Sequence, residues 1–316
     1  MKKFAMIAAL AGLLVDFQMV APANEGGGEK PFRFARFSED NELAKLETVI
    51  ASYRNDAGVE VDLIGVVHIG DTEYYEALNE KFKNYDVLLY EMVGGKDDGG
   101  AAEQKKSALR FFQILYQEMM DLDFQMNAID YDAPNFVHAD MDWAMFSKRM
   151  AKKDENVFGL MSKAFEHQEK MRAEGKGDGF FDMQKMVEAI YRGASAEEIK
   201  LEVAKQFANM DLIMEGMEEG DGGSVLIGER NRVALEVLEK ELKKGKKKLG
   251  LFYGAGHLPG MDEQLREEMG FEHIGEEWMP AWIIEKAAIQ DEKKEPVEKE
   301  EVERNKVAPI KQKKAA

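Results

Sequence analysis

Two histidines end matching glycine turns in distant parts of the chain. His68 ends the turn Gly65-Val66-Val67-His68, and His257 ends Gly254-Ala255-Gly256-His257. Each turn adjoins an apolar run typical of a buried strand. Both imidazoles are therefore expected at carboxyl ends of strands, where open α/β sheets bind ligands. Because glycine lacks a Cβ, we expect these glycines to take the tight conformation that turns each imidazole toward a shared crevice.

Glu91 brings a carboxylate to the same predicted site. It follows the apolar stretch Val87-Leu88-Leu89-Tyr90, which predicts a strand next to that of His68. A buried ionised carboxylate is costly unless it is paired or metal-bound, so Glu91 is either a metal ligand or the partner of a nearby arginine. With two imidazoles it could hold a divalent ion that leaves positions open for water. Zinc, manganese, cobalt and iron all accept such ligands.

Arg230 lies in Gly228-Glu229-Arg230-Asn231, at the start of a predicted amphipathic helix. A guanidinium there could hold a substrate carboxylate, the oxyanion of a tetrahedral intermediate, or Glu91 itself. With Glu91 as ligand or general base, Arg230 would be a second catalytic residue.

The segment His138-Ala139-Asp140 holds a third catalytic candidate. His138 could be a further metal ligand or a proton donor, and it follows a strand expected at Ala128 to Tyr131. Asp140 is the expected N-cap of a helix that begins near Met141. The two remaining histidines, His167 and His273, are expected to face solvent.

The elements around His68 predict one β-α-β unit. Glu60 to Val67 and Asp86 to Met92 are predicted strands, and Thr72 to Asn84 is a predicted helix with Asp71 as its N-cap. Tyr75, Leu78 and Phe82 share one face of that helix. The crossover should be parallel and right-handed.

The order strand, GxxH, helix, strand then recurs near the end of the chain. Lys248 to Tyr253 is a predicted strand, Met261 to Met269 a helix, and Trp282 to Ile284 a further strand. The recurrence predicts an α/β fold of two similar mixed or parallel half-sheets that face one another.

Helical spacing dominates the middle of the chain, where a large helical insertion over about 101–245 is expected to cover the site. The predicted helices are Gln104 to Met120, Asp142 to Lys152, Asn156 to Arg172, Asp182 to Tyr191, Ala196 to Met214 and Ser224 to Lys244.

The two ends of the chain differ from its centre. Residues 1–23 predict a secretory signal peptide, because Lys2 and Lys3 precede an apolar run and Ala21-Pro22-Ala23 offers a cleavage site. The mature protein is then expected in the periplasm or outside the cell. A linker over 24–30, an α/β domain over 31–288 and a disordered Lys/Glu-rich tail over 289–316 should follow. No later segment has the roughly 20 apolar residues that a transmembrane helix needs.

Composition excludes several classes of site. The 316 residues carry a net charge of −18, which makes nucleic acid a poor partner. There is no cysteine, so any metal ligand must be His, Asp or Glu. The sequence has no GxSxG, HExxH or P-loop spacing.

The stretches that carry these residues resemble the motifs of the TraB/PrgY/GumN family, which includes the Tiki metalloproteases. They are Leu63 to His68, Val87 to Glu91, Glu229-Arg230-Asn231 and Tyr253-Gly254-Ala255-Gly256-His257-Leu258-Pro259-Gly260. The last is the most specific. The resemblance covers roughly Asp62 to Ile284, and a relation to erythromycin esterase and ChaN-like folds has been suggested for the family. It implies a metal-dependent site at His68, Glu91 and His257, with Arg230 beside it.

We therefore expect a metal-dependent hydrolase of peptide or amide bonds, with a peptide or small-molecule substrate. His68, His257 and Glu91 would hold the ion, and Arg230 would steady developing negative charge. One alternative is a non-catalytic protein that sequesters a peptide, haem or metal in the same crevice. Another is an esterase that uses a histidine as its base and needs no metal. The sequence carries no signal for an oligomeric state.

Overall fold

The computed structural model describes residues 34–95, 122–174, 188–189, 191–207 and 223–292. A seven-stranded mixed sheet forms the centre of this part of the chain, and helices pack on it, so the protein is α/β. The sheet order is β1-β2-β3-β8-β5-β7, and β9 pairs with β2. The strands are β1 (Ala35–Glu39), β2 (Leu43–Asn55), β3 (Glu60–Val66), β5 (Val87–Tyr90), β7 (Phe136–His138), β8 (Lys248–Gly254) and β9 (Phe271–Glu285).

The four strands β3, β8, β5 and β7 run parallel, whereas β1, β2 and β9 form antiparallel pairs. The two GxxH strands are direct neighbours, with Gly65 opposite Tyr253 and Val66 opposite Gly254. The strand of Glu91 was predicted to lie next to that of His68, and this is wrong, because β8 inserts between β3 and β5. The predicted pair of facing half-sheets is not confirmed, since both GxxH strands belong to one sheet.

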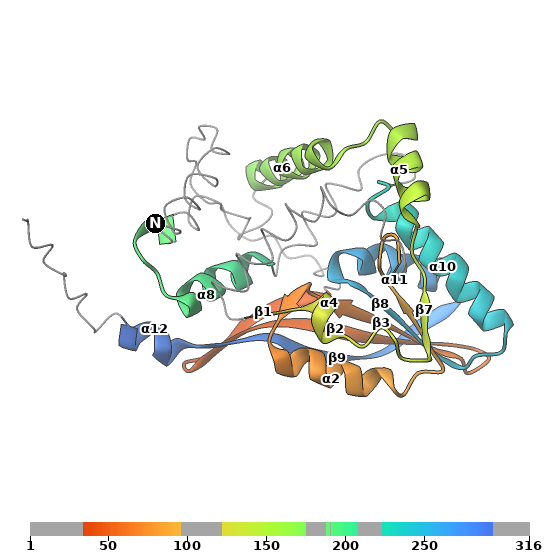
Figure 1. Ribbon diagram of the computed structural model, residues 1–316, viewed down its shortest axis with the longest axis horizontal. Helices are drawn as coiled ribbons and strands as arrows, with labels where there is room; N and C mark the ends of the chain where they lie inside the picture. The colour runs from red at the N-terminus through yellow and green to blue at the C-terminus, as the bar shows by residue number, and fades with distance from the viewer. Residues whose placement is uncertain (1–33, 96–121, 175–187, 190, 208–222, 293–316) are drawn as a thin grey trace, which may run out of the picture.

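Helices cover both faces of the sheet (Figure 1). In Figure 1, α2 runs along one side of the strands, and α10 and α11 lie on the other. The helices are α2 (Thr72–Phe82), α4 (Gln125–Ala128), α5 (Trp143–Lys152), α6 (Val157–Ala173), α8 (Ala196–Phe207), α10 (Gly228–Lys243), α11 (Leu258–Glu267) and α12 (Lys286–Glu292). A 3-10 turn spans Ala255–His257, and β4 (Ile69–Gly70) pairs with β6 (Asp123–Phe124) in a separate two-stranded sheet.

Two apolar clusters hold these layers together. Tyr75, Leu78 and Phe82 of α2 are buried on one sheet face, as the spacing of apolar residues predicted. Residues of α10 and α11, such as Leu238 and Met261, are buried on the opposite face. Burying a large apolar side chain stabilises the fold by roughly 1.5–3 kcal/mol, so both faces contribute to keeping the strand ends in place.

Several predicted boundaries and caps differ from the structure. Asp71 precedes α2 but makes no side-chain cap hydrogen bond; its carboxylate instead accepts from Lys200 Nζ at 2.7 Å and from Ile283 N at 2.6 Å. The buried ammonium of Lys200 attracts it more strongly than a neutral helix N–H would. The strand predicted at Ala128 to Tyr131 is wrong, because α4 occupies the first of these positions and the strand lies later, in β7.

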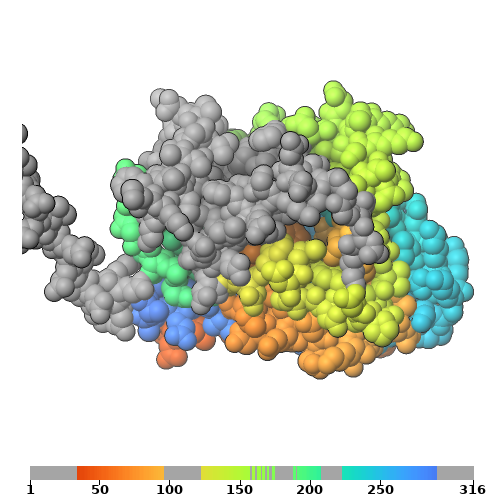
Figure 2. Space-filling model, in the orientation of Figure 1, coloured from red at the N-terminus to blue at the C-terminus, as the bar shows by residue number. Residues whose placement is uncertain are grey.

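The middle of the chain is not purely helical. Within the predicted insertion, β7 joins the main sheet and β6 pairs with β4. Figure 2 shows this segment, coloured yellow, at the surface against α2 and below α5 and α6. The helices predicted at Gln104 to Met120, in most of Asp182 to Tyr191 and in 208–214 lie outside the described residues.

The predicted signal peptide and linker, residues 1–30, also lie outside the described residues, as does the tail from 293 onward. The expected tail boundary at 288 falls inside α12, which continues to Glu292 and buries Ile289. Within the described ranges, no helix combines the length and apolar character that a membrane crossing requires.

Candidate functional site

The three predicted groups meet around Gly254, the last residue of β8. A Cβ built on Gly254 would lie 3.3 Å from Glu91 Oε2, 3.8 Å from His257 Cδ2 and 3.8 Å from His68 Cε1. The backbone N–H of Gly254 also donates to Glu91 Oε2 at 2.7 Å. Because β3, β8 and β5 are parallel neighbours, their carboxyl ends bring all three side chains to one place, as the sequence predicted.

The expected reason for the glycines is wrong. Gly254 has a φ of −50°, and Gly65 is absent from the left-handed region, so neither position needs a conformation that only glycine favours. Both need space instead. A Cβ at Gly65 would lie 3.1 Å from Leu258 Cδ1, and one at Gly254 would press on the carboxylate of Glu91.

Arg230 lies at the centre of the site, and all five of its N–H groups are used. Nη2 donates to Glu91 Oε1 at 2.5 Å and to Asp140 Oδ2 at 2.6 Å. Nε donates to Asp140 Oδ1 at 2.9 Å. Nη1 faces the carbonyl of Leu226 at 3.2 Å and His257 Nε2 at 3.3 Å. Of the three roles left open for Arg230, its contacts match the one of holding Glu91, because no N–H is left for a substrate.

The sequence predicted that Asp140 is the N-cap of a helix, and this is wrong. Asp140 is a partner of Arg230. Its carboxylate is fully buried and takes a bidentate pair of hydrogen bonds from the guanidinium. The cap of α5 is Asp142, whose side chain accepts from Met145 N at 2.6 Å. The hydroxyl of Tyr253 donates to the carbonyl of Ala139 and so fixes the residue before Asp140.

His257 is buried in this network. Its Nδ1 lies 2.7 Å from Asn231 Oδ1, and Asn231 Nδ2 donates to the carbonyl of His257 at 2.9 Å. A carbonyl can only accept, so the amide of Asn231 has one orientation, and His257 Nδ1 carries the proton. The lone pair of Nε2 then faces Arg230, 3.5 Å from Glu91 Oε1.

His68 is also held at Nδ1 by a side-chain amide, but its ring is exposed. Its Nδ1 lies 2.8 Å from Gln125 Oε1, and Gln125 Nε2 donates to the hydroxyl of Tyr131 at 2.8 Å. The imidazole is exposed, whereas Gln125 is buried. Within the described residues, no side chain or carbonyl pairs with His68 Nε2. Of the four ring nitrogens of His68 and His257, it is the one to which the described residues give no partner.

The charges explain how two carboxylates and a guanidinium share a buried space. Burial alone would raise the pKa of Glu91, but Arg230, and after it His257 and His68, hold that pKa well below its ordinary range. Burial likewise disfavours the charged form of Arg230, but Glu91 and Asp140 raise its pKa above the usual value. The pair is therefore ionised at neutral pH.

A divalent ion fits this arrangement poorly. Glu91 Oε1 and His257 Nε2 are close enough to share an ion, but Arg230 is hydrogen-bonded to both. A metal would have to displace the guanidinium, and its own charge would repel it. Among the described residues, no three His, Asp or Glu side chains form a group that could hold a metal as they stand. The predicted ligand set therefore needs Arg230 to release His257 first.

The other histidines have different places. His138 Nε2 donates to the carbonyl of Met92 at 2.7 Å, so the ring braces the loop after Glu91, and its catalytic role stays a prediction. Trp143 packs on the same loop, where Gly94 has a φ of +90° and a Cβ would come within 2.3 Å of the indole. His273 is exposed, as expected, but His167 is buried, so its predicted solvent-facing position is wrong.

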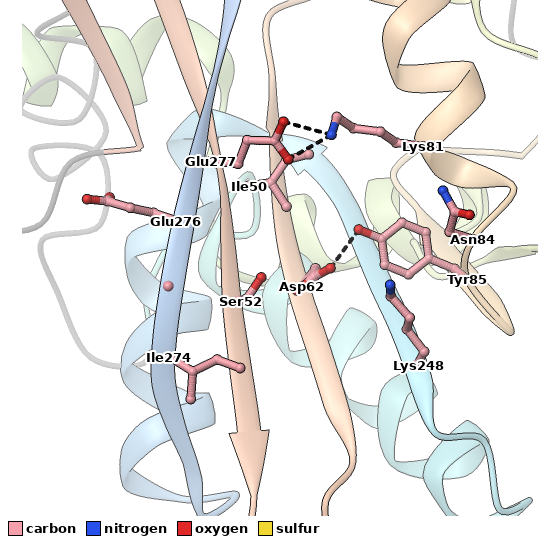
Figure 3. A pocket seen from close by; sticks show the side chains of 11 residues that line it. Ile50, Ser52, Asp62, Lys81, Asn84, Tyr85, Lys248, Ile274, Glu276 and Glu277 are labelled. Carbon is pink, nitrogen blue, oxygen red and sulfur yellow. Dashed lines mark hydrogen bonds and ion pairs between the residues drawn. The ribbon is translucent and has the colours of Figure 1, made fainter.

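A separate pocket of about 420 Å³ lies at the other end of the parallel strands (Figure 3). Asp62 and Lys248, near the starts of β3 and β8, line it together with Tyr85, whose hydroxyl donates to Asp62 Oδ2 at 2.7 Å. None of the predicted site residues reaches it.

Sequence reasoning missed Gln125 and gave Asp140 and Asn231 no role at the site. The sequence could have predicted a role for Asn231, because this residue follows Arg230 directly in the Glu229-Arg230-Asn231 motif and lies with it on α10. Gln125 has no sequence signal, since its position depends on the β4–β6 pairing.

Comparisons of this chain with protein-family models, curated proteins and solved structures gave no match.

Proposed function

We propose that the protein is a hydrolase that cleaves a peptide, amide or ester carbonyl, with His68 as its general base. The observation that carries the proposal is an exposed imidazole whose Nε2 has no partner among the described residues, near a carboxylate at the carboxyl ends of parallel strands. The family resemblance of the four quoted motifs supports the same reaction class, and we propose TraB/GumN-like membership on that basis.

In this proposal His68 Nε2 removes a proton from water as the water oxygen attacks the carbonyl carbon. The imidazolium then returns that proton to the leaving nitrogen or oxygen when the C–N or C–O bond breaks. The negative charge of Glu91 stabilises the imidazolium between these two steps. Arg230 acts as a positioning residue that keeps Glu91 ionised and in place. General-base assistance of this kind contributes roughly 10²–10⁴-fold to a rate.

A metal-dependent form of the same reaction is the second candidate. One observation favours it: both site imidazoles have Nδ1 held by a side-chain amide oxygen, and an outer partner of this kind is common for metal-binding histidines. A bound ion would supply a Lewis acid and a more acidic water.

We also propose that the matching GxxH strands reflect an internal repeat and that the middle helices cover the site.

Turnover of a dye-labelled unfolded protein and of a p-nitrophenyl ester tests the proposal. His68→Ala should lower the rate at least about 100-fold. His273→Ala, which alters an exposed histidine away from the site, should not change the rate. Equal rates for all three proteins would overturn the role of His68. Retention of a ligand by the wild type without turnover of either substrate would favour a binding protein.

Elemental analysis of the same preparations separates the two forms. Turnover that survives chelation, with no metal in the wild type, supports the metal-free reaction. About one metal ion per chain in the wild type, lost in both His68→Ala and His257→Ala, supports the metal-dependent reaction and requires Arg230 to move.

A further inference from the structure

The two-stranded sheet β4–β6 brings Gln125 beside His68. The strands are antiparallel, with Ile69 opposite Phe124 and Gly70 opposite Asp123, so His68, which precedes β4, lies opposite Gln125, which follows β6. Gln125 N then donates to the carbonyl of His68 at 2.9 Å. The backbone of His68 is held by the same residue whose side chain meets its ring, although 57 positions separate them.

The side chain of Gln125 has two partners and little freedom. Oε1 lies 2.8 Å from His68 Nδ1, and Nε2 donates to the hydroxyl of Tyr131 at 2.8 Å. Gln125 is only 4% exposed, and Tyr131 is also buried. Burial raises the pKa of Tyr131 above its usual value, so its hydroxyl stays neutral at physiological pH. If the amide were rotated by half a turn, Oε1 would accept from the Tyr131 hydroxyl and Nε2 would donate to His68 Nδ1.

We propose that Gln125 is a positioning residue that selects the Nδ1–H tautomer of His68 and so leaves the Nε2 lone pair over the site. In a neutral imidazole one ring nitrogen donates and the other accepts, and the bond made by one fixes the state of the other. Gln125 Oε1 can only accept. Nδ1 must then be the donor, and Nε2 is the nitrogen that can take a proton from water.

His257 gives independent support, because its environment has the same design with no ambiguity. Asn231 Oδ1 accepts from Nδ1 there, and its amide orientation is fixed by a backbone carbonyl. Two imidazoles at one site are thus each held at Nδ1 by an amide oxygen. The role of the lone pair in catalysis rests on the proposed function, but the tautomer itself does not.

Nitrogen-15 NMR of the imidazole rings, recorded at about pH 9 where a model imidazole is neutral, tests the tautomer without a substrate. The five histidines keep the spectrum simple, and His68→Ala identifies the His68 signals. The wild type should show Nδ1 protonated and Nε2 bare. Gln125→Glu, which offers only acceptors, should keep that state. Gln125→Leu should lose it, so that His68 populates the Nε2–H tautomer.

Gln264→Leu is the matched control, because Gln264 donates to the carbonyl of Gly260 and makes no hydrogen bond to an imidazole of the described residues. It should leave the His68 signals unchanged. A wild type with Nε2 protonated, as a rotated amide requires, would overturn the proposal. Unchanged His68 signals in a folded Gln125→Leu would also overturn it. If Gln125→Leu fails to fold, loss of the Nδ1–H state in a folded Gln125→Glu contradicts the proposal equally.

Turnover adds a second reading. Gln125→Leu should slow the reaction by at least about 10-fold, and Gln125→Glu should retain most of it, because only the former loses the selected tautomer. A fixed tautomer in a protein without turnover would sink the proposed hydrolase and leave the role of Gln125 intact.

Discussion

The two GxxH histidines occupy matching places on neighbouring strands, yet their surroundings differ. His257 is buried, and its Nε2 lone pair faces Arg230. His68 is exposed, and its Nε2 has no partner in the described part of the chain. Each has Nδ1 held by an amide oxygen, so the difference lies at the reactive nitrogen. One histidine completes an ionic network, and the other is the one to which we assign proton transfer in the proposed reaction.

The buried half of this comparison depends most on Arg230. In Arg230→Met, Asp140 and Glu91 lose their common cation, and removing one member of a buried ion pair costs about 3–5 kcal/mol. Urea unfolding at neutral pH measures the loss. Arg266→Met is the matched control, because Arg266 also makes a bidentate pair, with Asp262, but is 47% exposed. It should cost under about 1 kcal/mol. Similar losses for both would contradict a buried network.

Truncating each histidine separates their roles directly. His257→Ala leaves buried partners on both sides unpaired and should destabilise the protein by about 1–3 kcal/mol. His68→Ala should cost under about 1 kcal/mol, because water can reach its place. Thermal unfolding of both variants gives the difference. Equal losses of stability would mean that the two environments are not energetically distinct.

The pH dependence of stability tests the charge of Glu91. A carboxylate whose pKa is lower in the folded state gives stability that is fully present above its unfolded value, and lost as pH falls through the folded pKa. The ordinary value here is 4.5, and Arg230 opposes burial to lower it. The stability advantage of the wild type over Glu91→Gln, about 1–3 kcal/mol, should hold above pH 5 and shrink progressively below about 4.5.

Urea unfolding of both proteins from pH 3 to pH 8 measures this advantage. An advantage that grows toward acid pH would contradict an ionised Glu91 in the folded protein.

The sequence predicted the parts of the site that depend on local pattern. Apolar runs ending in GxxH or glutamate located β3, β5 and β8, because buried parallel strands leave that signature. The order of the strands in the sheet leaves no such signature in the sequence, so β8 was not expected between β3 and β5. Asp140 has the spacing of a helix cap, and its pairing with Arg230 arises only from tertiary contact across 90 positions. Gln125 depends on the same kind of contact.

Gly254 lies between the two histidines and Glu91, and its substitution by alanine tests how closely these groups must be placed. The Cβ of Gly254→Ala would lie 3.3 Å from Glu91 Oε2 and strain the 2.7 Å hydrogen bond from the backbone N–H. The carboxylate must then shift by a few tenths of an ångström relative to His68. Stability should fall by about 1 kcal/mol, the low end for overpacking, because Glu91 keeps Arg230.

Turnover should respond more strongly to this shift than stability does. Small misplacements of catalytic groups cost large factors in rate, so Gly254→Ala should lose about 10-fold or more. Gly275→Ala is the control, because nothing lies within 4 Å of its Cβ position. It should match the wild type in both stability and rate. A Gly254→Ala protein with full turnover would show that the position of Glu91 relative to His68 does not matter to the reaction.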